Sequence, residues 1–290
     1  MNNIFVFTKL AAASAALVLA AVLFSPTMFH SIADAEEQRS FNFTVQTSPG
    51  QDVLKVGEEL IYNVSYAFFD LGSVRIQVLD TMTKGGVKVY KAKAFIDSYS
   101  GVPFVNLHYV FYSEITTNFY TMLFTSHDTA DPERINFVHY LFDYKNKKVH
   151  YKVGINPKNE IVKEGSESIT DVQQDGLSLF FFARNNVREK KKMKTPVFMN
   201  EKTFYTDFNF LNNIVSQEID AVDYPIETVE FEGNANFTGI YGLTGYFRGY
   251  FSNDEAAVPI VAKMKVLLGS INIELMKWNR PGWTPPPAKE

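Results

Sequence analysis

The strongest constraint on this chain is a strict alternation of large apolar and smaller or polar side chains early in the sequence. From Leu60 to Phe68 every even position is large and apolar or aromatic, and the odd positions include Asn63 and Ser65. Successive side chains of an extended strand point to opposite faces, so this period predicts a strand with one buried face. The same alternation returns at Val74–Val78 and predicts a second strand. The sequence therefore favours β structure.

Turn signals separate these segments at short intervals. We expect Asp70–Gly72 to reverse the chain, Lys84–Gly86 to form a hairpin turn, and Lys145–Lys148 to close another. Further strands are predicted over residues 87–96, 118–126, 136–144, 149–154, 203–210, 213–221, 226–237, 244–252, 258–267 and 270–278. The predicted fold class is all-β and mainly antiparallel, with a large curved sheet that closes into a half-barrel or sandwich.

One segment departs from the alternation. Leu177, Phe180 and Phe181 recur at helical spacing after Asp171 and Asp175, either of which can cap a helix. We predict one short helix near residues 175–187. The basic stretch Arg188–Lys194 follows, and we expect an exposed connector there rather than a docking site for anionic lipid headgroups.

The first 35 residues have the order of features of a secretory signal peptide. Lys9 precedes an apolar run from Leu10 to Phe24, and Ala33 and Ala35 form a small-x-small cleavage site. The alternative is an uncleaved N-terminal anchor. We expect residues 36–280 to form a single β-rich domain and the Pro-rich tail, 281–290, to be disordered or extended.

Composition limits the cellular locations and the kinds of partner that the chain could have. It has no cysteine, so it lacks both disulfides and the lipobox cysteine of a bacterial lipoprotein. Its net charge of −4 gives no electrostatic footprint for nucleic acid. No segment after the signal is long and apolar enough for a transmembrane helix. We therefore expect an exported protein that is periplasmic or peripherally held at the membrane.

Aromatic residues make up 15% of the chain and recur at strand spacing. A strongly curved sheet lined in this way could enclose an apolar ligand such as a lipid chain, although a filled core explains the same pattern. The candidate ligand-binding residues, of which the first three are expected on one strand face, are Tyr62, Tyr66, Phe68, Tyr246 and Tyr250.

Catalytic signatures are scarce. The sequence has no nucleophile elbow, zinc-binding helix motif, phosphate loop or dinucleotide fingerprint, and we expect no cofactor. The most suggestive polar cluster is His127 with Asp128, Asp131 and Glu133, which could hold a metal or pair a base with an orienting carboxylate. The proline and the alternating polarity favour a solvated turn between two strands instead. We expect a non-enzymatic module that binds an apolar envelope ligand or a protein partner. The alternative is an envelope hydrolase or metal-dependent enzyme using this cluster.

Several segments resemble one family of exported bacterial proteins, the domain of unknown function 3108 family. These are Gly57–Tyr66 followed by Gly72–Val74, the Leu- and Phe-rich stretch Asp171–Arg184, and the closing segments Gly249–Ile260 and Leu268–Ile271. The resemblance covers residues 55–278. It implies no active-site residue, because the family's function is unassigned. By analogy of fold alone, it suggests a curved antiparallel sheet like those of periplasmic lipoprotein carriers.

Overall fold

The computed structural model describes residues 53–103, 105–237, 245–265 and 270–289. The predicted signal peptide, with Ala33 and Ala35, lies outside these residues. The elements are β1 (Glu59–Tyr66), β2 (Phe69–Lys84), β3 (Val87–Ser98), β4 (His108–Thr116), β5 (Thr121–Asp128), β6 (Ile135–Asp143), β7 (Lys148–Asn156), β8 (Glu160–Ser168), α1 (Gly176–Asn186), β9 (Lys192–Met199), β10 (Lys202–Gln217), β11 (Ile226–Ala235), β12 (Gly245–Ser252), β13 (Pro259–Lys265) and β14 (Ser270–Asn279).

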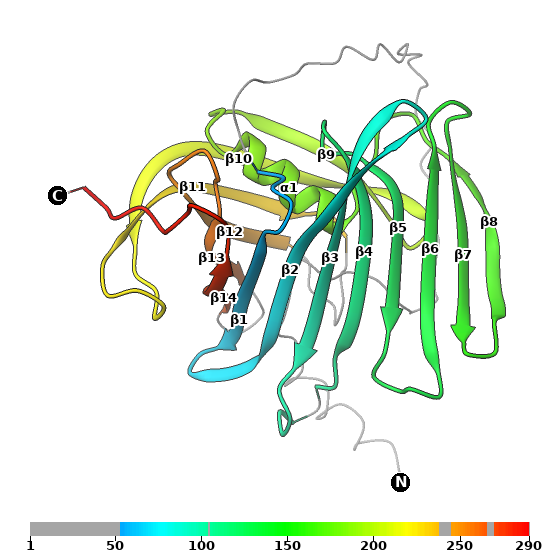
Figure 1. The fold of residues 1–290 in the computed structure, drawn as a ribbon, viewed down its shortest axis with the longest axis horizontal. Helices are drawn as coiled ribbons and strands as arrows, with labels where there is room; N and C mark the ends of the chain where they lie inside the picture. Colours follow the sequence, from blue (N-terminus) through cyan, green and yellow to red (C-terminus); the bar gives the residue numbers. More distant parts are fainter. Residues whose placement is uncertain (1–52, 104, 238–244, 266–269, 290) are drawn as a thin grey trace, which may run out of the picture.

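All described strands belong to one antiparallel sheet. Its order is β8-β7-β6-β5-β4-β3-β2-β1-β14-β13-β12-β11-β10-β9. Two meanders are thus joined in the middle, where β1 pairs with the last strand and Val64 lies opposite Ile273. The sheet curls strongly and stays open, so β8 and β9 are its edges (Figure 1). The predicted all-β class and half-barrel shape are confirmed.

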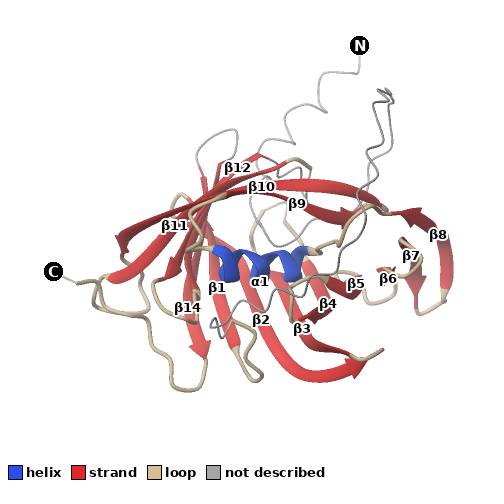
Figure 2. Cartoon of the chain, turned by 90° about the horizontal axis from the view of Figure 1, so that it is seen from above, coloured by secondary structure: helices blue, strands red, loops and turns tan. Residues whose placement is uncertain are grey.

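The helix lies in the hollow of the curled sheet, between the β1–β4 part and the β9–β12 part (Figure 2). Its observed bounds confirm the predicted helix near residues 175–187. Phe181 and Leu177 are buried within the same core as the inward side chains of the strands. Because the helix covers apolar surface that one curled sheet cannot cover by itself, it completes the core.

Two predicted turns are confirmed and one is wrong. Gly85 and Gly86 have φ angles of 57° and 82° and link β2 to β3, as the paired glycines predicted. The turn between β6 and β7 also lies where the Lys- and Asn-rich segment predicted it. The chain does not reverse at Asp70–Gly72. It reverses earlier, at Ala67 (φ 53°), and β2 already begins at Phe69.

Several predicted strand bounds differ from the observed ones, because strand pairing and not local alternation decides where a strand begins and ends. Residues 203–210 and 213–221 were predicted as two strands, but β10 is continuous through an irregularity at Asn212, whose φ is 55°. Pairing with β11 resumes after a register shift, so the chain does not need to reverse. The predicted connector Arg188–Lys194 ends early, because Lys192 already pairs with Asn209. The strands β4 and β8 were missed.

The Pro-rich tail turns at Pro281 and Gly282 and then runs alongside the start of β11 as far as Ala288. The Tyr224 hydroxyl donates to the Pro285 carbonyl at 3.0 Å, and the Glu227 amide donates to the Pro286 carbonyl at 2.8 Å. The Ala288 amide donates to the Pro225 carbonyl at 2.8 Å. The tail thus follows the start of β11, where carbonyls accept and the missing proline donors are not needed. None of the described helices is long and apolar enough to cross a membrane.

Candidate functional site

The interior of the curled sheet is occupied by side chains. Tyr140, Phe181, Phe198 and Phe210 are among the largest fully buried residues. The rings of Tyr140 and Phe198 meet edge to face, with centroids 5.0 Å apart. Aromatic pairs of this geometry stabilise a packed core beyond their buried area alone. The aromatic enrichment in the sequence therefore supplies much of the core itself.

The five sequence-predicted ligand residues do not gather in one place. Tyr62 and Tyr250 are buried in the core. Tyr66 is half-buried at the end of β1, whereas Phe68 lies in the β1–β2 turn and is 85% exposed. The expectation that Tyr62, Tyr66 and Phe68 share one strand face is wrong for Phe68, because the strand ends before it. Tyr246 points to the outer face of the sheet.

Tyr246 lines a hollow of about 520 Å³ on the outer face of the sheet near the β9 edge. We call it the tyrosine hollow. Its floor crosses four neighbouring strands, β9 to β12. The lining residues are Lys192, Met193, Lys194, Asp207, Phe208, Asn209, Glu232, Gly233, Asn234 and Tyr246. The volume falls within the range usual for small-molecule sites.

The carboxylates of the tyrosine hollow are already engaged. Asn209 Nδ2 and the Tyr246 hydroxyl each donate to Glu232 at 2.8 Å. These two hydrogen bonds, Asn209 first, lower the pKa of Glu232. Partial burial and the bond to Glu232 raise the pKa of Tyr246, so it stays a neutral phenol. Asp207 accepts a short hydrogen bond from Asn236.

The two lysines of the tyrosine hollow have different neighbours, and the charge of Lys192 contributes to the lowered pKa of Glu232. Lys194 Nζ lies 4.7 Å from the ring centroid of Tyr205. Within the described residues neither Lys192 nor Lys194 forms an ion pair. Both ammonium groups therefore keep donors for a ligand at the edge of the hollow, where sequence reasoning expected only a solvated connector.

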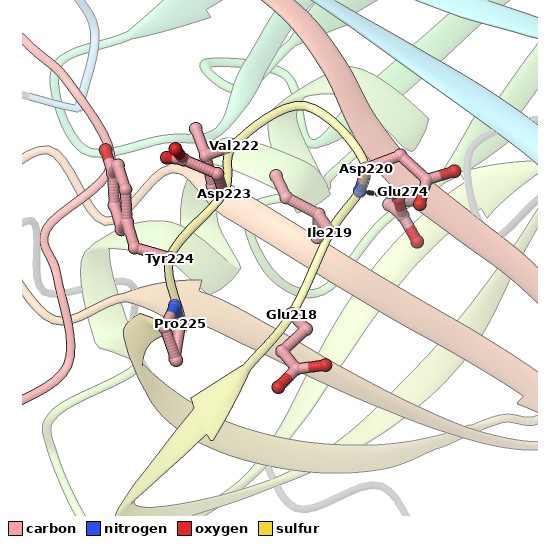
Figure 3. Close-up of a pocket in the computed structure, with 8 residues that line it drawn as sticks. All are labelled: Glu218, Ile219, Asp220, Val222, Asp223, Tyr224, Pro225 and Glu274. Atoms are coloured by element: carbon pink, nitrogen blue, oxygen red, sulfur yellow. Dashed lines mark hydrogen bonds between the residues drawn. The ribbon is translucent and has the colours of Figure 1, made fainter.

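A second hollow, of about 550 Å³, is acidic and lies under the β10–β11 loop (Figure 3). Glu218, Asp220 and Asp223 come from the loop, and Glu274 comes from β14. The Asp220 amide donates to Glu274 Oε1 at 2.9 Å, which ties the loop to the sheet. Nothing in the sequence pattern placed Glu274 beside this loop, because the two are more than fifty residues apart.

The His127 cluster does not converge on one point. Asp128 Oδ1 accepts from the Ala130 amide at 3.2 Å, and Asp131 Oδ1 accepts from the Glu133 amide at 2.9 Å. These are contacts within a turn. The His127 ring lies 6.4 Å from the Phe137 ring. In the part of the chain that is described, no group of three His, Asp or Glu side chains could hold a metal ion.

We expect His127 and His139 to make the stability of the protein depend on pH. Both are half-buried, and burial is the largest cause that lowers the pKa of each imidazole. A folded-state pKa below the unfolded value near 6.5 means that the unfolded chain binds more protons there. We expect stability to be full well above pH 6.5, to fall as the pH drops from about 6.5 toward the lower folded pKa values, and to level off below them. Urea unfolding at pH 8 and pH 5.5 measures this.

The double variant His127→Gln/His139→Gln should lose part of that pH dependence. His150→Gln is the matched control because His150 is exposed on β7. An unchanged difference between the two pH values in the double variant would show that these two imidazoles do not cause it.

Two buried polar groups hold α1 in place. Asp175 caps the helix and also accepts hydrogen bonds from Ser113 at 2.5 Å and Thr121 at 2.8 Å, on β4 and β5. At the other end of the helix Arg184 pairs with Glu58 at 2.6 Å. Both groups are fully or almost fully buried. They are positioning groups for the fold, since neither lines the two hollows.

Comparison with known proteins places the chain in a family. No curated protein matches it. Among solved structures, it is similar to the crystal structure of a β-barrel-like protein of domain of unknown function DUF1849 from Brucella abortus. That likeness has a TM-score of 0.44 and 13% identity, and covers 78% of this chain and 98% of that one. The model of DUF3108, a protein family of unknown function, matches residues 61–276. This chain therefore belongs to the DUF3108 family.

Proposed function

We propose that this protein is an exported, non-enzymatic binding protein of the cell envelope, and that it binds an anionic amphiphile, a fatty acid or phospholipid, in the tyrosine hollow. The observation that carries the proposal is the pairing of an open hollow with two lysines that form no ion pair among the described residues. A ligand with an acyl chain and a negatively charged head matches that combination.

Two contacts support the choice of an anionic head. Glu232 and Asp207 are satisfied by Asn209, Tyr246 and Asn236, so they need no cation from a ligand. Lys192 and Lys194 stand at the β9 edge of the same hollow and would meet a carboxylate or phosphate. The ring of Tyr246, which is 39% exposed, offers apolar surface to the chain of the ligand.

The predicted signal segment supports the location. An exported protein that is periplasmic or peripherally held at a membrane meets lipids at close range. We place the ligand on the outer face of the sheet because the side chains of Tyr140, Phe198 and Phe210 fill the inside.

Binding of oleate and of oleyl alcohol to the purified protein tests the proposal, because the two ligands differ only in the charged head. We expect Lys192→Ala/Lys194→Ala to weaken oleate binding about 30-fold, at about 1 kcal/mol for each lysine, and to leave oleyl alcohol unaffected. Tyr246→Ala should weaken both ligands. Isothermal titration or native mass spectrometry gives the affinities.

The control variant Lys145→Ala/Lys148→Ala removes two exposed lysines, one from the β6–β7 turn and one from the first position of β7, and should bind oleate like the wild type. If Lys192→Ala/Lys194→Ala binds oleate as tightly as this control does, the two lysines do not bind the anionic head. If neither oleate nor oleyl alcohol binds, the lipid proposal fails, and a protein partner becomes the occupant to seek.

A further inference from the structure

The turn between β1 and β2 exposes two adjacent phenylalanines. Phe68 is 85% exposed and Phe69 is 60% exposed. Their ring centroids are 4.4 Å apart, so the two rings form one apolar cap at the end of the hairpin. Single exposed apolar residues are common, but two adjacent large rings at the tip of a turn mark a contact surface.

The scaffold under this cap is well fixed. Tyr99, in the neighbouring loop, donates its amide to the Leu71 carbonyl at 2.9 Å and its hydroxyl to Asn63 Oδ1 at 3.2 Å. Asn63 Nδ2 in turn donates to Asp70 Oδ1 at 2.6 Å. The residues that flank the two rings are therefore held by hydrogen bonds, and Tyr99 itself is 37% exposed.

The charge pattern of the turn indicates its partner. Tyr66–Gly72 contains no lysine or arginine, and its single carboxylate, Asp70, is held back by Asn63. A projecting, uncharged aromatic cap complements the uncharged acyl region of a bilayer. Phe and Tyr rings lie favourably at the boundary between headgroups and acyl chains. The protein as a whole carries a net charge of −4, so attraction to anionic lipid would not bring it there.

We propose that the Phe68–Phe69 turn docks this protein on a lipid bilayer by inserting both rings among the acyl chains. This goes beyond the proposed ligand site and does not depend on it, because the turn and the tyrosine hollow share no residue. Docking through uncharged rings should depend little on salt and on the anionic lipid content of the membrane.

The absence of cysteine makes a direct test simple. In the full-length chain, Phe68→Cys labelled with an environment-sensitive fluorophore reports on the tip alone, whatever the N-terminal segment does. With phosphatidylcholine vesicles we expect a blue shift and quenching by spin labels on the acyl chains. Added phosphatidylglycerol and high salt should change the signal less than twofold. The control is Ile214→Cys, since Ile214 is another large apolar residue that is 60% exposed, but it lies on β10.

A second substitution checks the remaining ring. Phe69→Ser in the labelled chain should reduce the blue-shifted fraction at least tenfold, while Ile214→Ser should not, and both should keep the wild-type thermal midpoint. Phe69→Ser should leave oleate binding unchanged, which separates this proposal from the ligand site. No shift with either vesicle would overturn docking on a bilayer. So would a shift that appears without vesicles as protein concentration rises, because that result would assign the cap to contact between protein copies.

Discussion

Arg184→Ala is expected to lower the free energy of unfolding by about 3–5 kcal/mol, the cost typical of breaking a buried ion pair. The Arg184 side chain has no exposed surface and donates to both carboxylate oxygens of Glu58, at 2.6 and 3.0 Å. It also donates to the carbonyls of Ala256 and Ala257, at 2.9 and 3.2 Å. Truncation would remove the Arg184 donors from all four of these buried acceptors and leave Glu58 with Arg280 alone.

The arrangement also explains why a lysine cannot replace Arg184. The two parallel bonds to Glu58 need the planar fork of a guanidinium, and Glu58 also accepts from Arg280 at the end of β14. The Arg184–Glu58 pair and Arg280 together join the start of β1, the helix, the β12–β13 loop and the end of β14. Arg184→Lys should therefore lie between the wild type and Arg184→Ala.

Chemical denaturation monitored by circular dichroism measures this effect. Arg248→Ala is the control, because Arg248 is 44% exposed and pairs with Glu230 at 3.3 Å on the outer face. A surface pair of this kind contributes about 0–1 kcal/mol. Equal losses in the two variants would mean that burial of the Glu58 pair has no special weight.

Asp175→Ala is expected to lower the free energy of unfolding by about 2–4 kcal/mol, since it removes a helix cap and the carboxylate that accepts from two buried hydroxyls. One carboxylate oxygen accepts from the amides of Leu177 and Ser178, at 2.6 and 3.0 Å. The other accepts from Ser113 and Thr121. Burial raises the pKa of Asp175 even though these hydrogen bonds oppose the shift.

The conservative variant separates the two roles of this carboxylate. Asp175→Asn keeps one oxygen for the helix amides but turns an amide donor toward Ser113 and Thr121. We therefore expect its loss of unfolding free energy to lie between those of the wild type and Asp175→Ala. Asp143→Ala is the control, because Asp143 makes similar bonds to Asn146 in an exposed turn. Its denaturation midpoint should stay close to the wild type. A midpoint for Asp175→Ala that also stays there would show that the cap is dispensable.

Much of the fold could be predicted from local pattern. The alternation at Leu60–Tyr66 predicted β1, the paired glycines predicted the β2–β3 turn, and the helical spacing after Asp175 predicted α1. Strand β4 was missed because Tyr109, Val110, Phe111 and Tyr112 are large on both faces, which hides the period of two. Strand β8 was missed because all of its residues are exposed, so no apolar face identifies it.

The two hollows could not be predicted in this way. Tyr246 was singled out for its spacing, but its partner Glu232 and the two lysines of β9 join it only through pairing across four strands. The acidic hollow combines a loop with a strand more than fifty residues away. Sequence periodicity states which side chains share a face, and it does not state which distant strand lies beside them.

The sequence by itself determined that this chain is an antiparallel β protein with one short helix, because alternation, turn residues and capping are local properties. Tertiary structure decided what the aromatic residues do. Tyr62 became core because its face of β1 turned inward when the sheet curled. Tyr246 and Tyr250 share one face of β12, yet only Tyr250 is buried, because neighbouring parts of the chain cover that end of the strand. Phe68 became an exposed cap because the chain reverses at Ala67, one residue before the alternation would have buried it. Burial depends on how the whole sheet closes, and no local pattern contains that information.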